Sequence, residues 1–269
     1  MSHLNNKIAA IFSEIDHILP EVWEIAVSLY ENPEIGGEEE KSSMLLIQSL
    51  ENHGFTVTRD YFGIKYAFRA VFDSGKPGAS IGIFAEYDAL SEIGHGCCHN
   101  LICTSALAAA YGLQSVMAET GGKVIVYGTP GEENLQTKTI MAPLGAFHEA
   151  DVAMMMHPDG ASASSGRTRA IESLQIEFFG KTSHAGAAPE LGINALDAAV
   201  LCYQMIYQQK SYYPDTNVHG IIDQGGTKAS VIPDYTCLKY LTRAWDMDTL
   251  KKLRTMVENC AEAAAKATG

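Results

Sequence analysis

Residues 81–103 read IGIFAEYDALSEIGHGCCHNLIC, and the organisation of the whole chain can be worked out from this stretch. It opens on an apolar segment, Ile81–Ala85, whose composition favours a buried β-strand. An apolar helix is expected over residues 101–117, and the loop before it holds metal-binding types of side chain: Glu86, Asp88, Glu92, His95, Cys97, Cys98 and His99. A strand that delivers such groups at its C-terminal end is typical of an α/β active site. The stretch therefore predicts a metal site.

Composition limits the classes of function. The chain has 269 residues, enough for one large or two modest domains, and a formal net charge of −13, which argues against a nucleic-acid partner. No apolar run reaches the ~18 residues of a membrane span, and the polar N-terminal segment does not resemble a signal peptide. The six cysteines are expected to be thiols or ligands rather than disulfides. We expect a cytoplasmic protein.

The first half of the chain alternates strands with helices. Strands are expected over residues 55–60, 64–72, 80–87, 123–127 and 152–156, and helices over 8–29, 38–52, 101–117 and 137–149. This alternation predicts an α/β sheet with helices on both faces.

The second half has a different order of elements. Residues 162–166 are small and polar, which suggests a crossing between domains. A strand at 171–179, a helix at 194–208, strands at 218–223 and 235–244 and a helix at 249–266 follow. That order is a ferredoxin-like plan without its last strand. We expect a metal-binding catalytic domain over residues 1–168 and a lid or dimerisation domain over 169–269.

Three loops of the first half carry the chemistry. Cys97 and His99, the pair Glu132 and Glu133, and His157 each follow a predicted parallel strand, so they should meet at one edge of the sheet. Thiolate, imidazole and carboxylate suit zinc and, with more oxygen, manganese. One glutamate of the pair can bind metal while the other acts as a general base. Asp88 would not bind metal itself but would orient an imidazole ligand or a metal-bound water.

Each of these residues also has a simpler explanation. A lone histidine such as His157 is more often a surface or core residue, and adjacent glutamates are usually solvated. Cys97 and Cys98 could be small buried side chains or a redox-reactive pair. Taken together, ligand-type residues after three successive strands favour a metal site.

Five motifs in order, the first of them in two parts, resemble the two-metal amidohydrolase and exopeptidase family, metallopeptidase family M20. They are AEYDAL at 85–90, GCCHN at 96–100, GTPGEEN at 128–134, MMMHPDG at 154–160, KTSHAGAAPELGINALDAA at 181–199 and VIPD at 231–234. The resemblance extends from about Pro33 to Arg243. It implies a zinc-exopeptidase-like mixed sheet with helices on both faces, joined to a ferredoxin-like α+β lid.

The resemblance also implies roles for single residues. Two divalent metal ions, zinc or manganese, would be bound by Cys97, His99, Glu133 and His157, with Glu132 as the catalytic glutamate. His184 resembles the histidine that a lid contributes to a partner subunit's active site, which implies a homodimer. Arg243 falls where relatives hold a substrate carboxylate. A surface histidine and a solvated arginine are the simpler alternatives for these last two.

The chain also departs from the family pattern. Cys98 stands where the family usually has glycine, and Ser230 where relatives often carry an asparagine that contacts the reacting group. The last lid strand and the return to the catalytic domain, with the family's final histidine ligand, are not in the sequence. His219 is the only histidine after His184, and with Ser230 it is a candidate for substrate binding.

We therefore expect a metal-dependent hydrolase of amide bonds in small N-acyl amino acids or dipeptides, shortened at its C-terminus. The run Glu86-Tyr87-Asp88 resembles the dipeptidase and aminobenzoyl-glutamate branch. The alternative is a silent remnant that binds metal or dimerises without turnover, and thiol redox chemistry is a distant third. No nucleic-acid or membrane partner is expected.

Overall fold

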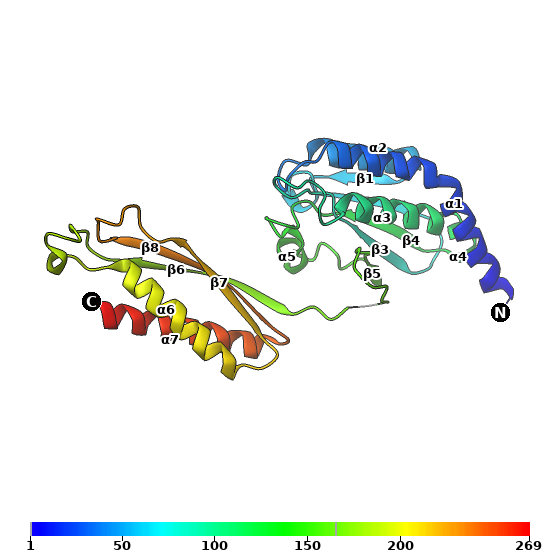
Figure 1. Cartoon of the computed structure of the whole chain (residues 1–269). Coiled ribbons are helices and arrows are strands. Elements are labelled where there is room, and N and C mark those ends of the chain that lie inside the picture. The colour runs from blue at the N-terminus through cyan, green and yellow to red at the C-terminus, as the bar shows by residue number, and fades with distance from the viewer. Residues whose placement is uncertain (1, 165) are drawn as a thin grey trace. The chain divides into compact units, whose positions relative to one another are not determined.

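The computed structural model describes residues 2–164 and 166–269 (Figure 1). The chain divides into two compact units, one ending at Ser162 and the other extending from Ala163 to Gly269. Each unit has its own β-sheet and its own hydrophobic core.

The first unit is built on a five-stranded mixed sheet. Its strands are β1 (Thr56–Arg59), β2 (Phe68–Asp73), β3 (Ser80–Ala85), β4 (Lys123–Gly128) and β5 (Val152–Met154), in the spatial order β1-β2-β4-β3-β5. Strand β3 lies between β4 and β5 and is parallel to both, while β2 is antiparallel to β1 and β4. The C-terminal ends of β3, β4 and β5 therefore share one edge, as the sequence predicts.

One face of this sheet carries the long helices. They are α1 (Ser2–Glu31), α2 (Glu40–Asn52) and α3 (His99–Gln114), followed by the short α4 (Met117–Thr120) (Figure 1). Their apolar sides and the strands form the main core, in which Leu46, Leu50, Phe68 and Leu107 are completely buried. Removing such side chains from water supplies about 1.5–3 kcal/mol each, so this face holds the unit together.

The other face is covered by a shorter segment. Helix α5 (Thr137–Met141) and the 3-10 turn η2 (Ala142–Leu144) lead to Phe147, whose ring packs edge-on against Phe84 and Tyr127. The expectation of one helix over residues 137–149 is wrong. Gly145, in the left-handed region at φ +83°, ends the helical path just after Pro143.

Strand β2 also differs from its prediction, because it begins at Phe68 rather than near residue 64. The intervening chain forms the 3-10 turn η1 (Tyr61–Gly63) and then passes Tyr66 at φ +68°. A residue with positive φ cannot continue a β ladder, so the apolar residues before Phe68 pack from a loop.

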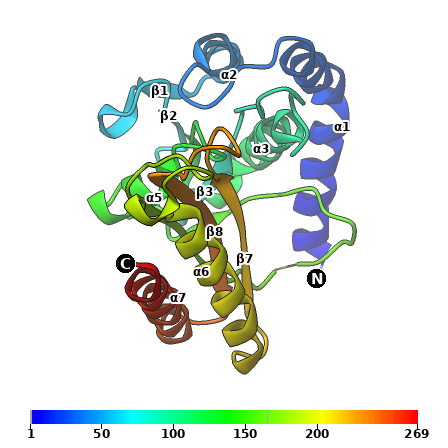
Figure 2. The ribbon, with the colours of Figure 1, turned by 60° about the vertical axis from the view of Figure 1, so that its left-hand side comes forward.

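The second unit has a three-stranded antiparallel sheet. Its strands β6 (Ala170–Phe179), β7 (Asn217–Gln224) and β8 (Tyr235–Ala244) lie in the order β6-β8-β7. Helices α6 (Ala195–Gln209) and α7 (Met247–Thr268) lie side by side on one face (Figure 2), with short 3-10 turns η3 (Pro189–Leu191) and η4 (Lys210–Tyr212). Asn194 and Asp246 accept backbone N–H groups at the helix starts. The ferredoxin-like order is confirmed.

Among the described residues, no helix combines the length and apolarity that crossing a bilayer requires.

Candidate metal centre

Three loops of the first unit bring their ligand-type side chains together. Cys97, His99 and Glu133 offer donor atoms that all lie within 4.8 Å of one another, and so do Glu86, His99 and His157. The loops follow β3, β4 and β5, so their convergence comes directly from the parallel arrangement of these strands. The structure thus brings together all four residues to which the resemblance gives a metal-binding role.

His99 is fixed by a carboxylate behind it. Its Nδ1 lies 3.0 Å from Oδ1 of Asp88, and both side chains are almost completely buried. The other oxygen of Asp88 accepts the backbone N–H of Glu133 at 3.0 Å. Asp88 therefore orients two of the candidate ligands and leaves only Nε2 of His99 free to bind a metal.

The pKa values of this pair follow from that contact. Burial alone would raise the pKa of Asp88, but the hydrogen bonds from His99 and from the Glu133 backbone lower it overall. For His99, burial lowers the pKa, and the contact with Asp88 more than reverses this, so its pKa is raised. The pair therefore favours an ionised Asp88 carboxylate that accepts a hydrogen bond from Nδ1–H of the His99 ring.

The Cys97 thiol is surrounded by negative charge. Its hydrogen bond to Glu133, followed by burial and the nearby carboxylates, raises its pKa to about 11. The protein without metal therefore keeps this thiol protonated at neutral pH, and a metal ion must displace the proton to bind sulfur.

Glu132 lies outside both groups of donors although it neighbours Glu133. Burial, and then the negative charge of Glu86, raise its pKa. A carboxylate that is not claimed as a ligand and whose pKa is raised suits a general base.

A buried carboxylate supports the loop that carries these glutamates. Glu39, completely buried at the start of α2, accepts the backbone N–H of Gly131 at 2.6 Å through Oε1 and that of Gly37 at 2.7 Å through Oε2. Beside it, the Asn134 side chain donates to the carbonyl of Gly36 at 2.8 Å. These contacts join segments 92 residues apart and fix the position of the Glu132 loop.

Cys98 precedes the first residue of α3 in the left-handed conformation, at φ +61°. A residue with a Cβ is strained there by about 1–2 kcal/mol, whereas glycine is not. This conformation gives a physical reason for the glycine that the family usually has at this position.

Sequence reasoning did not assign two residues of this centre. Glu86 is buried beside His99, and its Oε1 contacts Nζ of Lys138 on α5. Glu86 lies within the opening stretch, two residues before Asp88, and its burial at the end of β3 could have been suspected. Lys138 is 52 residues away, in a segment with no motif of its own, so no pattern in the sequence indicated the contact.

In the second unit, His184 and Ser230 lie close together. His184 bridges to Val231, and the carbonyl of Ser230 accepts the N–H of Ala185 at 3.0 Å. Nδ1 of His184 accepts the backbone N–H groups of Gly186 and Ala187 at 3.2 and 3.1 Å. In the neutral ring the proton must therefore be on Nε2, where the exposed side chain can donate it.

Arg243 and His219 lie at the other end of the same sheet. Arg243 is next to the last residue of β8 and pairs with Asn217, while His219 pairs with Leu241. Strand β8 begins at Tyr235, on the side of Ser230 and Val231, and along it Arg243 lies about 27 Å and Leu241, the partner of His219, about 20 Å from that start. Within one chain, the structure therefore does not bring Arg243 and His219 to His184 and Ser230.

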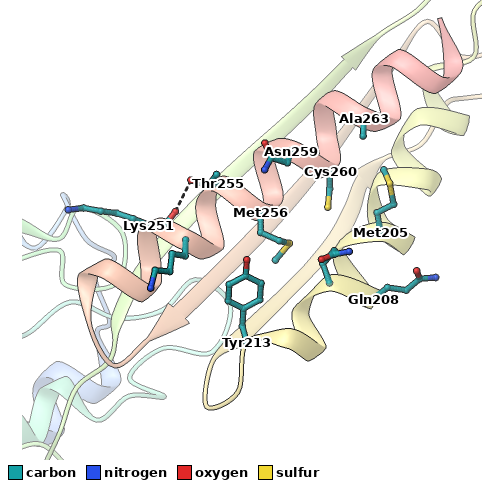
Figure 3. Close-up of a pocket in the computed structure, with 11 residues that line it drawn as sticks. Met205, Gln208, Tyr213, Lys251, Thr255, Met256, Asn259, Cys260 and Ala263 are labelled. Carbon is teal, nitrogen blue, oxygen red and sulfur yellow. Dashed lines mark hydrogen bonds between the residues drawn. The ribbon is translucent and has the colours of Figure 1, made fainter.

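A groove of about 510 Å³ lies between α6 and α7 and is lined by Met205, Tyr213, Met256 and Cys260, with Lys251 at one end (Figure 3). None of the predicted site residues lines it. The groove offers thioethers, amides and lysines rather than a set of metal ligands. The candidate metal site is therefore the one in the first unit.

The comparisons with known sequences agree with the motifs. Residues 167–269 match the model of the peptidase dimerisation domain. The chain is 37% identical over 268 residues to the Xaa-Arg dipeptidase of Mus musculus, covering 95% of this chain and 62% of that protein. It is 35% identical over 268 residues to one of the subunits of p-aminobenzoyl-glutamate hydrolase of Escherichia coli K12, covering 91% and 55%. The chain thus spans less than two thirds of the length of these relatives.

The fold has solved counterparts. A dinuclear metal-binding peptidase of the M20 family from Bacillus subtilis superposes with a TM-score of 0.67 at 18% identity, over 94% of this chain and 72% of that chain. At this identity the likeness shows the fold.

Proposed function

The chain belongs to the M20 family of peptidases, and on that premise we propose that it hydrolyses the amide bond of dipeptides or small N-acyl amino acids with the help of two divalent metal ions. The observation that carries the proposal is the convergence of Cys97, His99, Glu133 and His157 beside Glu132. Relatives described as acting on Xaa-Arg dipeptides and on p-aminobenzoyl-glutamate support this substrate class.

The residues present fit a pair of divalent ions. A thiol, imidazoles and carboxylates form the donor set that zinc and manganese accept. His99 already presents Nε2 because Asp88 holds Nδ1, and Oε2 of Glu86 is buried without a hydrogen-bond partner among the described residues. Ions bound there would supply Lewis acidity to the scissile carbonyl and to the attacking water.

The chain's own residues would move the proton. Glu132, whose pKa is raised by burial and by Glu86, would accept the proton of the attacking water and return it to the leaving amine. His184, with its proton on Nε2, would donate a hydrogen bond to the developing oxyanion. A donor whose orientation is already fixed by two backbone N–H groups needs little reorganisation as charge develops.

We also propose a homodimer formed through the second unit. Within the described residues, β6 and β7 each pair on one side only, and Phe179, Ile221 and Ile222 are exposed on them. Unpaired edges with apolar side chains are suited to pairing with a second chain. Six free cysteines support a reducing compartment such as the cytoplasm.

The deciding experiment is a substrate panel with the metal-loaded chain. Chain equilibrated with Mn²⁺ or Zn²⁺ should release free amino acid from Xaa-Arg dipeptides or from p-aminobenzoyl-glutamate. Glu132→Gln should reduce turnover by about 10²–10⁴-fold while leaving the metal content unchanged. Metal binding without hydrolysis of any member of the panel would contradict the proposal, and sedimentation velocity on the same samples tests the dimer.

A further inference from the structure

Glu86 is the most deeply placed acidic residue of the metal centre after Asp88, with 2% of its surface exposed. It directly follows β3 and enters one of the two groups of potential metal ligands, with His99 and His157. The family resemblance gave it no role in binding metal. A carboxylate is seldom buried this completely unless its charge is compensated.

The two oxygens of Glu86 have different surroundings. Oε1 contacts Nζ of Lys138, which compensates one side of the group. Oε2 is buried and has no hydrogen-bond partner among the described residues, and it lies 3.6 Å from Nε2 of His99, too far for a good hydrogen bond. An unpaired buried acceptor costs about 1–3 kcal/mol, and more when charged, so a cation at Oε2 would remove a real penalty.

The count of available donors also leaves room for a further ligand. Both groups of donors include His99, but Asp88 occupies its Nδ1, so the ring has one lone pair to offer, on Nε2. One imidazole nitrogen binds one metal ion. When the first ion takes Cys97, His99 and Glu133, the two groups leave Glu86 and His157 for the second.

We infer that Glu86 is a direct ligand of the second metal ion, bound through Oε2 alone because Lys138 occupies Oε1. This inference rests on the proposed two-metal function and adds a residue to it. Lys138 acts as a positioning residue: it contacts Oε1 and leaves Oε2, beside Nε2 of His99, as the oxygen available to a metal ion.

The test is metal binding rather than activity. Wild-type chain and Glu86→Gln are titrated with Mn²⁺ by calorimetry, and bound metal is counted by mass spectrometry after dialysis. The wild type should hold about two ions per chain. Glu86→Gln, which keeps the shape but loses the charge, should hold about one, or bind the second ion more weakly by at least the ~10–100-fold that loss of a supporting residue costs. Glu92→Gln, an exposed acid of the same loop, is the matched control and should change neither value.

The variant Lys138→Met distinguishes a metal-binding role of Glu86 from a purely structural ion pair between Glu86 and Lys138. If Glu86 binds metal, this variant should still hold two ions, because Oε2 is untouched. If Glu86 serves only as a partner for Lys138, both variants should lower the melting temperature and leave both dissociation constants as in the wild type, and the inference is then overturned.

A folding failure would not leave the question open. If Glu86→Gln is insoluble, Glu86→Asp decides, because a ligand shortened by one methylene should weaken the second ion alone. Unchanged dissociation constants in Glu86→Asp would overturn the inference. The proposed function fails separately, when the wild type binds metal but hydrolyses none of the substrates, or binds no metal.

Discussion

The two units present their candidate residues in opposite ways. In the first, Glu133 and His157 are exposed, but His99, Asp88 and Glu86 are buried: Asp88 holds His99, and Asp88 and Glu86 are contacted by Glu133 and Lys138 from the next loop and helix. In the second, His184, Ser230, His219 and Arg243 are exposed, and they divide between the two ends of one sheet. A site that lies within one folded unit is preorganised by that unit. In the proposed homodimer, assembly would bring residues of the second unit to this chemistry, so their mutation should affect turnover rather than metal binding.

The largest expected effect is a loss of turnover on substitution of His184, compared with His219 at the other end of the same sheet. His184→Ala should reduce turnover by about 10²–10³-fold, as loss of an oxyanion donor typically does, with metal content unchanged. Steady-state kinetics on the best substrate of the panel measures it. His219→Ala, at the far end of the sheet, is the comparison and should have a much smaller effect. Equal losses of turnover in the two variants would mean that the position of a histidine along this sheet does not decide its effect on the reaction.

Asp88→Asn tests the preorganisation of the first unit. The amide keeps the shape but removes the charge that fixes His99 and receives the Glu133 N–H, so metal affinity should fall by about 10–100-fold. Competition with a chelator of known affinity measures the change. Asp73→Asn alters an exposed carboxylate paired with Lys123 and should leave the affinity unchanged. If both variants bind metal like the wild type, the buried hydrogen bonds do not support the site.

The pH dependence of metal binding tests the ligand role of Cys97. Its thiol has a pKa raised to about 11, by the Glu133 hydrogen bond first, so below that pH a bound metal must displace a proton. Affinity should therefore rise with pH, by up to about 10-fold per unit for one proton, and more steeply where His99 is also protonated. Titration calorimetry between about pH 6.5 and 8.5 gives the slope. Cys97→Ser should flatten it and Cys98→Ser should not; a slope unchanged in Cys97→Ser would exclude sulfur as a ligand.

The smallest expected effect concerns the backbone at Cys98. Cys98→Gly should stabilise the fold by about 1 kcal/mol, because glycine adopts the φ of +61° without strain. Urea denaturation measures the free energy of unfolding. Cys98→Ala removes the thiol and keeps the strain, so it should give no gain. Equal stability of the two variants would show that the thiol, and not the backbone, sets the cost.

The convergence of the three loops in the first unit could be predicted from the sequence for a topological reason. Strands β3, β4 and β5 are parallel neighbours, so residues that follow them must meet, whatever the loops do in detail. The contact between Glu86 and Lys138 could not be predicted in this way. It depends on how the chain turns after Gly131 and on the early end of α5, features set by local backbone geometry rather than by a periodic pattern.

The elements of the second unit were also predictable, since β8 has the expected bounds and α6 and α7 differ from theirs by at most two residues at each end. The functional placement of its residues was not. Motif order puts His184 and Arg243 in one family pattern, but nothing in a linear sequence shows that His184 bridges to Val231, just before the end of β8 opposite to Arg243.

The carboxylate of Glu39 has a consequence for local motion. Because it accepts hydrogen bonds from the backbone N–H groups of both Gly37 and Gly131, the turn before α2 and the turn that holds Glu132, the proposed general base, should open only as a pair. The Gly131 amide should then exchange its hydrogen with deuterium as slowly as amides in the central strands, although it lies in a loop. The position of Glu132, the proposed proton acceptor, would thus be stabilised by Glu39 at the start of α2, far away along the chain.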